Sequence, residues 1–160
     1  MKDSENMNIQ FEYLNENDLR ECFDLCMRCF DEDSQFTDVE ETYQICKNDP
    51  HYHFIVGKIQ GHIVAYATMT IFYSLFDGKM PNATIWYVCV DSNYRRTGIG
   101  KLLFDEIERI ACNNNCQIIY LTCLKDNVSA QKFYNSIGYS GDKEKAFVKY
   151  FYWYIFRAWW

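Results

Sequence analysis

One segment, residues 88–107, constrains the fold of this chain more than any other. It reads VCVDSNYRRTGIGKLLFDEI, an apolar strand followed by a turn rich in arginine and glycine and then by a helical pattern. Glycine lets the backbone of such a turn approach a ligand closely, and the first N–H groups of a helix have no partner within the helix. Anions bind at helix N-termini of this kind. The segment therefore predicts a site for a phosphate-bearing cofactor.

Two common phosphate-binding motifs do not fit this turn. A P-loop needs glycine five positions before its Gly-Lys pair, but Arg95 stands five positions before Gly100, and Leu102 stands where the motif needs Ser or Thr. A dinucleotide-binding fingerprint that starts at Gly98 would need a small residue where this chain has Leu103. The pattern that remains is Arg-x-x-Gly-x-Gly.

Hydrophobic periodicity divides the rest of the chain into alternating strands and helices. Strands 83–90 and 117–124 flank the helix of the turn, so we expect them to be parallel neighbours, and the other strands to pair antiparallel. This order predicts an α/β fold, with a mixed, mainly antiparallel sheet and helices on both faces. The remaining expected strands are 9–14, 53–59 and 62–73, of which the last two are joined at Gln60-Gly61, and 147–156. The expected helices of the first fifty residues are one capped by Asn15 or Asn17 and ending near Phe30, and one opened by a Thr37–Glu40 capping box and ending near Asn48. Two later helices are expected at 98–113, after the turn, and at 127–137, ended by Gly138.

The composition restricts the classes of partner. The 160 residues suit one domain, and the net charge of −6 comes from the first fifty residues, because the remainder has more Lys and Arg than Asp and Glu. An acidic chain without a basic aromatic stripe is not typical of nucleic-acid binding, and no apolar run is long enough to span a membrane. The polar N-terminal residues do not resemble a secretory signal, so we expect a cytoplasmic location.

The eight cysteines do not predict a disulfide framework or a metal centre. In a cytoplasmic protein they are expected to be reduced thiols that pack as small apolar residues. Cys22, Cys26 and Cys29 fall on one predicted helix face, where Cys46 or nearby histidines would have to complete a metal site. No second Cys-x-x-Cys pair lies at zinc-knuckle spacing, so we expect no metal.

Three motifs together resemble the GCN5-related N-acetyltransferase (GNAT) family. They are the strand IWYVCVD at residues 85–91, the Arg-x-x-Gly-x-Gly turn at residues 95–100, and NVSAQKFYNSIGY at residues 127–139, which matches the family signature N-x-x-A-x-x-F-Y-x-x-x-G-F/Y. They occur in the family's order and spacing over about residues 83–139. The resemblance implies the acyl-CoA N-acyltransferase fold, in which the parallel strand pair splays apart.

The resemblance also implies an arrangement of the chain and an activity. One N-acetyltransferase domain would span residues 1–160, with the cofactor-binding core at about 83–139, acceptor-side helices at about 17–48 and a C-terminal aromatic strand or tail at about 147–160. The enzyme would transfer an acetyl group from acetyl-CoA to a primary amine that attacks the thioester directly. The aromatic run 150–160 is expected to form the last strand together with either a homodimer contact or a tail.

The same resemblance assigns residues to acetyl-CoA. The amides of the turn would hold its pyrophosphate, with added charge from the basic side chains, and the bulged main chain of Val88, Cys89 and Val90 would lie beside the thioester. Asn127 would bind the pantetheine arm and cap the last helix. The turn residues in this set are Arg95, Arg96, Thr97, Gly98, Ile99, Gly100 and Lys101.

Tyr134 is the catalytic residue that the resemblance implies, as the acid that protonates the departing thiolate. A thiol has a pKa of about 8.5 and a phenol of about 10, so tyrosine is protonated at neutral pH. The base stays open, because Trp86 stands about where many relatives carry glutamate. The alternatives are a water relay, Tyr87, or an acid from the loop Asp31–Asp33. An acyl-Cys89 route is not expected, since nothing in the sequence places an activating histidine beside it.

Acidic residues on the expected acceptor side favour a small cationic amine. Such an acceptor would be a polyamine or an aminoglycoside-like compound, and a lysine or peptide amine is an alternative. Another alternative is a non-catalytic module that binds or senses acyl-CoA, which would be favoured if the missing glutamate means that the protein has no base. The acidic residues are Asp31, Glu32, Asp33, Asp38, Glu40 and Glu41.

Overall fold

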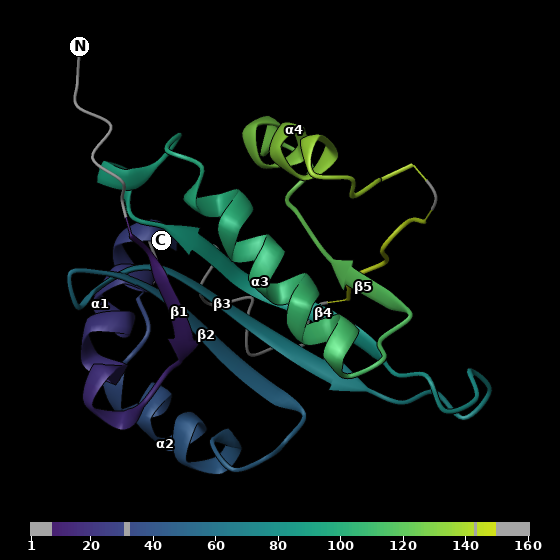
Figure 1. The fold of residues 1–160 in the computed structure, drawn as a ribbon, viewed down its shortest axis with the longest axis horizontal. Coiled ribbons are helices and arrows are strands. Elements are labelled where there is room, and N and C mark those ends of the chain that lie inside the picture. Colours follow the sequence, from purple (N-terminus) through teal and green to yellow (C-terminus); the bar gives the residue numbers. More distant parts are fainter. Residues whose placement is uncertain (1–7, 31–32, 143, 150–160) are drawn as a thin grey trace. The chain divides into compact units, whose positions relative to one another are not determined.

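The computed structural model describes residues 8–30, 33–142 and 144–149. The chain divides into two compact units, Met1–Leu121 and Thr122–Trp160. The second unit contains helix α4, Val128–Ser136. The first unit contains, in chain order, β1 Gln10–Tyr13, a 3-10 helix Glu16–Asp18, α1 Leu19–Phe30, α2 Phe36–Cys46, β2 Tyr52–Ile59, β3 His62–Phe72, β4 Asn82–Val90, a 3-10 helix Ser92–Tyr94, α3 Ile99–Asn113 and β5 Ile118–Leu121 (Figure 1).

The five described strands of the first unit form one sheet in the order β1-β2-β3-β4-β5. The first three neighbouring pairs are antiparallel, and β4 and β5 are parallel. Strands β2 and β3 are joined by Gln60 and Gly61, whose φ angles of 51° and 84° suit a two-residue hairpin turn with positive φ at both positions. The expected mixed α/β class and the parallel pair are confirmed.

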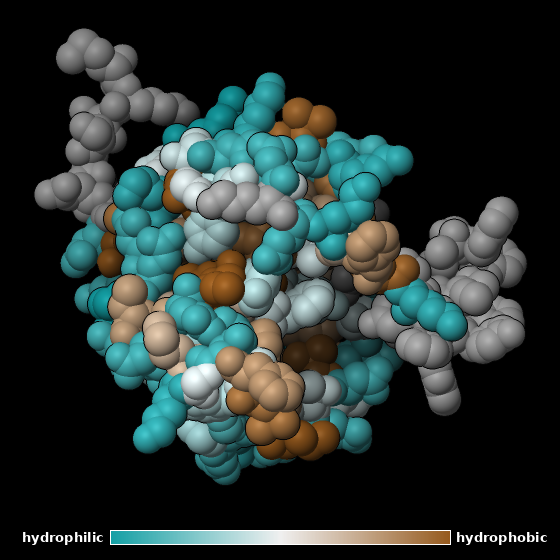
Figure 2. All heavy atoms as spheres, turned by 90° about the vertical axis from the view of Figure 1, so that its right-hand side faces the viewer, coloured by the Kyte–Doolittle hydropathy of each residue, from teal (hydrophilic) through white to brown (hydrophobic). Residues whose placement is uncertain are grey.

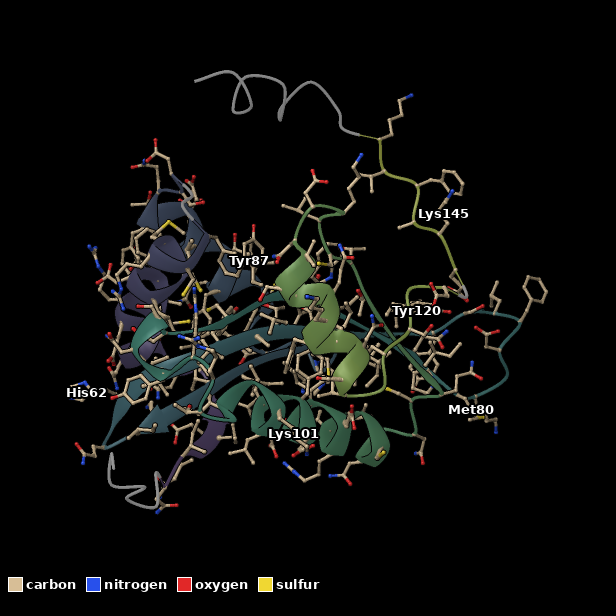
Figure 3. All side chains as sticks on the ribbon, turned by 90° about the horizontal axis from the view of Figure 1, so that it is seen from above. His62, Met80, Tyr87, Lys101, Tyr120 and Lys145 are labelled. Carbon is tan, nitrogen blue, oxygen red and sulfur yellow. The ribbon has the colours of Figure 1, made fainter. Side chains whose placement is uncertain are left out.

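Helices cover both faces of this sheet (Figures 1 and 3). On one face, α1 packs its buried positions Leu25 and Cys26 against Val56 of β2 and Tyr66 of β3. On the other face, α3 contacts β3 and β4 and buries Leu103, Phe104 and Ile107 among its residues. β3 is buried on both sides as a result, which explains its continuous apolar run.

The expected capping box of the second helix is wrong. Helix α2 starts at Phe36, and the side chain of its N-cap residue, Gln35, makes no capping hydrogen bond. Phe36 packs against Phe23 of α1 at a centroid distance of 5.3 Å, so tertiary packing draws it into the first turn. Thr37, the expected cap, therefore lies inside the helix. Before α1, by contrast, Asn15 accepts a hydrogen bond from the Asn17 N–H at 3.0 Å, as a cap should.

The loop between β3 and β4, residues 73–81, exposes large hydrophobic side chains. Leu75 is 92% exposed and Phe76 is 96% exposed. Figure 2 views the molecule from the side on which this loop projects in Figure 1, and hydrophobic residues stand there among hydrophilic ones. The loop thus contributes little to the core of the first unit.

The second unit is described through α4 and the coil that follows it. The helix ends where Gly138 adopts a φ of 97°, as the sequence predicts. Of the expected strand 147–156, residues 147–149 belong to no strand or helix, and the others lie outside the described residues. In the described ranges of the chain, no helix is both long and apolar enough to cross a membrane.

Candidate active site

Strand β4 carries a bulge just before the predicted thioester-binding residues. Tyr66 of β3 pairs with Cys89, but Thr68 pairs with Trp86, so two residues of β4 lie opposite one residue of β3. Tyr87, in the bulge, has a φ of 54°, a left-handed conformation that costs about 1 kcal/mol for a residue other than glycine. Its ring lies 5.3 Å from that of Phe30 in an edge-to-face contact, which holds it on the α1 side of the sheet (Figure 3). Bulges of this kind bend a strand and redirect its backbone.

The bulge coincides with the end of pairing between β4 and β5. The parallel register runs from Asn82–Ile118 to Ile85–Leu121 and includes no later residue of β4 in the first unit. Residues 86–90 of β4 therefore have no described strand beside them on the β5 side. An extended ligand chain could pair with the backbone there as an added strand does. Val88, Cys89 and Val90 lie on this segment, and the side chain of Cys89 is buried.

The predicted phosphate-binding turn leads from β4 into α3. Asp91 accepts a hydrogen bond from the Asn93 N–H at 2.9 Å and so caps the short 3-10 helix. Two residues of the turn then adopt positive φ, Arg96 at 62° and Gly98 at 93°. This reversal places Gly98 at the N-cap of α3.

The turn presents a row of backbone donors. The Leu102 N–H donates to the Gly98 carbonyl at 3.1 Å, which is the first hydrogen bond of α3. Within the described ranges, the N–H groups of residues 96–101 donate to no carbonyl or side chain. Unpaired N–H groups at the N-terminus of a helix attract anions, because the helix dipole adds to their partial charge. The row lies at the residues that the sequence predicts for a pyrophosphate site, and the binding of a pyrophosphate there stays a prediction.

The basic side chains of the turn differ in their partners. Arg95 donates through Nε to the Val90 carbonyl at 3.1 Å and so ties the turn to β4. Lys101 pairs with Asp105, one helical turn later, at 2.9 Å. Arg96 is exposed and has no ion pair with another described residue. Of the three, Arg96 is the one whose charge is not engaged by another described residue.

The second unit holds the other two predicted site residues. Asn127 is the N-cap of α4, and its Oδ1 accepts a hydrogen bond from the Ala130 N–H at 3.1 Å. Burial, and to a smaller extent the neighbouring Cys123, raises the pKa of Tyr134 above its ordinary value. The Tyr134 hydroxyl is therefore protonated at neutral pH.

A cavity of about 460 Å³ lies between α1, α2 and the sheet. Trp86 and Tyr87 of the bulge line it, so the cavity borders the segment of β4 that has lost its neighbour strand. Apolar and aromatic side chains, thiols and hydroxyls form the remaining walls. Among the described residues, no Asp, Glu, Lys, Arg or His lines it.

The acidic residues expected around an acceptor have other positions. Asp33, Asp38, Glu40 and Glu41 are exposed and do not line the cavity. Asp31 and Glu32 lie outside the described residues.

Thiols gather where α1 crosses β4. A hydrogen bond with Cys22 raises the pKa of Cys26, one with Cys26 raises the pKa of Cys89, and one with Cys89 raises the pKa of Cys29. Burial adds to each of these shifts. The Cys89 side chain is thus a neutral thiol rather than a nucleophilic thiolate. In the described part of the chain, no group of three or more His, Cys, Asp or Glu side chains is arranged to hold a metal ion.

The sequence alone did not reveal the walls of the cavity. Thr68 and Thr70 of β3 face it from the sheet, and the Thr68 hydroxyl is 2.7 Å from that of Tyr66. Two threonines at alternate positions in an otherwise buried apolar strand were the available signal, because they mark one face of the strand as polar.

Comparison with known proteins agrees with this architecture. A probable spermine N(1)-acetyltransferase of Bacillus subtilis subsp. natto is 27% identical over 121 residues, which are 71% of this chain and 78% of the relative. A transcriptional regulator from Bacillus halodurans has a TM-score of 0.80 at 22% identity, covering 89% of this chain and 100% of that one. Glucosamine-6-phosphate N-acetyltransferase from Arabidopsis thaliana has a TM-score of 0.77 at 21% identity, covering 90% and 99%.

The family assignment rests on the sequence of most of the first unit and of α4. Residues 19–139 match the Acetyltransferase (GNAT) family, and this range contains the bulged strand, the turn with its row of amides, and the Asn127 cap. The chain belongs to the GNAT family of acetyltransferases.

Proposed function

We propose that this enzyme transfers the acetyl group of acetyl-CoA to the primary amine of a small molecule that is cationic in solution. The observation that carries the proposal is the row of N–H groups at residues 96–101, which follows directly on the bulged end of β4. A diphosphate needs several converging donors, and an extended arm needs a strand edge. Both features stand on one continuous stretch of backbone.

Acetyl-CoA fits the residues that form this stretch. The amides of residues 96–101 would hold its diphosphate, and Gly98, at a φ of 93°, forms the N-cap of the helix that begins there. The main chain of Val88, Cys89 and Val90 would hold the pantetheine arm beside β4, with Asn127 as a further partner. When bound, acetyl-CoA supplies an acetyl group already activated as a thioester.

We assign the acid to Tyr134. The leaving thiolate must gain a proton, and a raised phenol pKa keeps that proton on Tyr134 at neutral pH. Direct attack by the amine is favoured over an acyl-Cys89 route, because the Cys89 thiol is neutral in its buried cluster.

The proton that leaves the amine has no carboxylate acceptor among the described residues of the cavity wall. An amine with a pKa near 10 is mostly protonated at neutral pH, so this step needs water or a hydroxyl group. Tyr87 and the Thr68 hydroxyl both line the cavity and would serve as members of such a relay.

An amine acceptor is supported by the names of the relatives. The Bacillus subtilis relative is named for acetylating spermine, and the Arabidopsis structure for acetylating an amino sugar phosphate. A cytoplasmic location and a homodimer are further parts of the proposal. Gel filtration with light scattering would test the second of these.

The decisive experiment follows thiol release from acetyl-CoA with a panel of amines. We expect calorimetric binding of acetyl-CoA and thiol release that depends on the amine. At a concentration one hundredfold above its dissociation constant, acetyl-CoA should stabilise the fold by about 2.7 kcal/mol. Binding without thiol release for any amine or peptide would favour a non-catalytic acyl-CoA sensor. Absence of binding would overturn both functions.

A further inference from the structure

The walls of the cavity between α1, α2 and the sheet bear on the kind of amine that this enzyme accepts. We infer that the acceptor is a monoamine whose ammonium is attached to an apolar, ring-bearing body, and that polyamines are poor acceptors. This inference rests on the proposed function, because it takes the cavity beside the bulge as the acceptor site. It makes the proposed cationic acceptor more specific, since such an amine carries one positive charge.

The first argument is the chemistry of the walls. Phe23 and Met27 of α1 and Tyr52 and Phe54 of β2 all line the cavity. Surfaces of this kind gain free energy by covering an apolar body. A chain of several ammonium groups would lose its hydration against them, and that loss costs free energy unless each charge is paired. The volume of about 460 Å³ lies within the range of cavities that enclose small ligands.

The second argument is the lack of compensating charge. A polyamine that enters the cavity must bury several ammonium groups, and each needs an anion or a set of acceptors. No carboxylate lines the cavity in the described residues, and the acidic side chains Asp38 and Glu40 of α2 are exposed outside it. Those acids are therefore not placed to pair with an ammonium inside the cavity.

The third argument is the position of the few polar groups. The hydroxyls of Thr68 and Thr70 lie on the sheet face of the cavity, on β3 next to β4. Thr68 pairs in register with Trp86, a residue that is 48% exposed and also lines the cavity. One ammonium can be held there by hydroxyl oxygens and an aromatic face, beside the bulge where the thioester is proposed to lie. The remaining walls then cover the apolar body.

Two amines of contrasting type test the inference, 2-phenylethylamine and spermidine. Each is titrated calorimetrically into the full chain saturated with CoA, and each is assayed for thiol release from acetyl-CoA. We expect 2-phenylethylamine to bind about tenfold more tightly and to have the higher kcat/KM. Equal or tighter binding of spermidine, or a higher kcat/KM for spermidine, would overturn the inference while leaving the proposed acetyl transfer intact.

A matched pair of variants at Thr42 tests the charge argument. Thr42 is exposed on α2, lines the cavity, and donates its hydroxyl to the Asp38 carbonyl at 2.8 Å, so both glutamate and glutamine should be tolerated there. Thr42→Glu should raise the affinity for spermidine severalfold relative to Thr42→Gln, because only the former adds a carboxylate to the wall. Identical spermidine affinities in the two variants would contradict the assignment of the cavity to the acceptor. If no amine is acetylated, the proposed function is wrong, and the titrations still decide the preference of the cavity.

Discussion

Gly98 determines the backbone conformation at the N-terminus of α3, where it is the N-cap residue. Its φ of 93° is favourable only for glycine, and a Cβ added there would meet no atom within 4 Å. The requirement for glycine is thus one of backbone conformation rather than space. Any other residue would pull the turn toward negative φ and change where the amides of residues 96–101 point.

Gly98→Ala should therefore weaken acetyl-CoA binding more than it weakens the fold. The expected loss of stability is about 1 kcal/mol, from the left-handed conformation of alanine. The expected loss of affinity is about tenfold or more, because several amides move together. Urea unfolding and calorimetry measure the two effects.

Gly78→Ala provides the matched control. Gly78 also has positive φ, at 68°, and open space around its Cα, but it lies in the loop before β4. We expect a similar loss of stability and an unchanged affinity for acetyl-CoA. Equal losses of affinity in both variants would show that Gly98 has no special part in binding.

Tyr134→Phe should lower kcat by about 10²-fold with little change in the KM for acetyl-CoA. The raised pKa of Tyr134 also means that its proton is retained at higher pH than in free tyrosine. Deprotonation of Tyr134 should accordingly cause no fall in the wild-type rate below a pH of about 10. A fall in affinity with an unchanged kcat would assign Tyr134 to binding instead of proton transfer.

At the scale of single elements, helix α2 shows how packing overrides a local signal. The Thr37–Glu40 pattern predicts a cap, yet Phe36 enters the first turn to pack against Phe23, and Gln35 becomes an N-cap without a side-chain bond. The N-terminus of this helix is therefore less stable than a capped one.

Gln35→Ser should stabilise the chain by about 1 kcal/mol, since serine can accept a hydrogen bond from the first turn. Thr37→Ala should change stability by less than about 0.5 kcal/mol, because Thr37 caps nothing. The midpoint of urea unfolding measures both variants. A large loss with Thr37→Ala would restore the capping box that the sequence predicts.

Strand β4 shows which parts of a site can be predicted from local sequence. The crossover of β4, α3 and β5 and the Gln60-Gly61 hairpin follow from periodicity and turn chemistry, and both were predicted. The bulge was expected only from the resemblance to the family, because a tyrosine with positive φ has no local signal. Tyr87 is held by Phe30, more than fifty positions earlier in the chain, through tertiary contact.

The cavity was hidden from the sequence for a related reason. Its walls come from two helices and three strands, and only their assembly shows that none of the described wall residues is charged. The charge of the first fifty residues predicted an acidic wall, whereas the described acidic residues of α2 face outward. The turn from β4 into α3 is a single continuous segment, so its place in the fold could be predicted from its own residues. Its assignment to the cofactor stays a prediction.

At the scale of the whole molecule, the proposed function requires CoA to contact two segments of the chain. The turn would bind one part of CoA and strand β4 would bind another. CoA should slow amide hydrogen exchange at residues 96–101 through its diphosphate and at residues 86–90 through its pantetheine arm. Pantetheine has the same arm without the diphosphate, so at the same concentration it should leave exchange at residues 96–101 unchanged. Exchange in α4, read separately, reports whether Asn127 and Tyr134 also respond. Slowing of residues 96–101 by pantetheine, or no slowing by CoA, would contradict the assignment of those amides to the diphosphate.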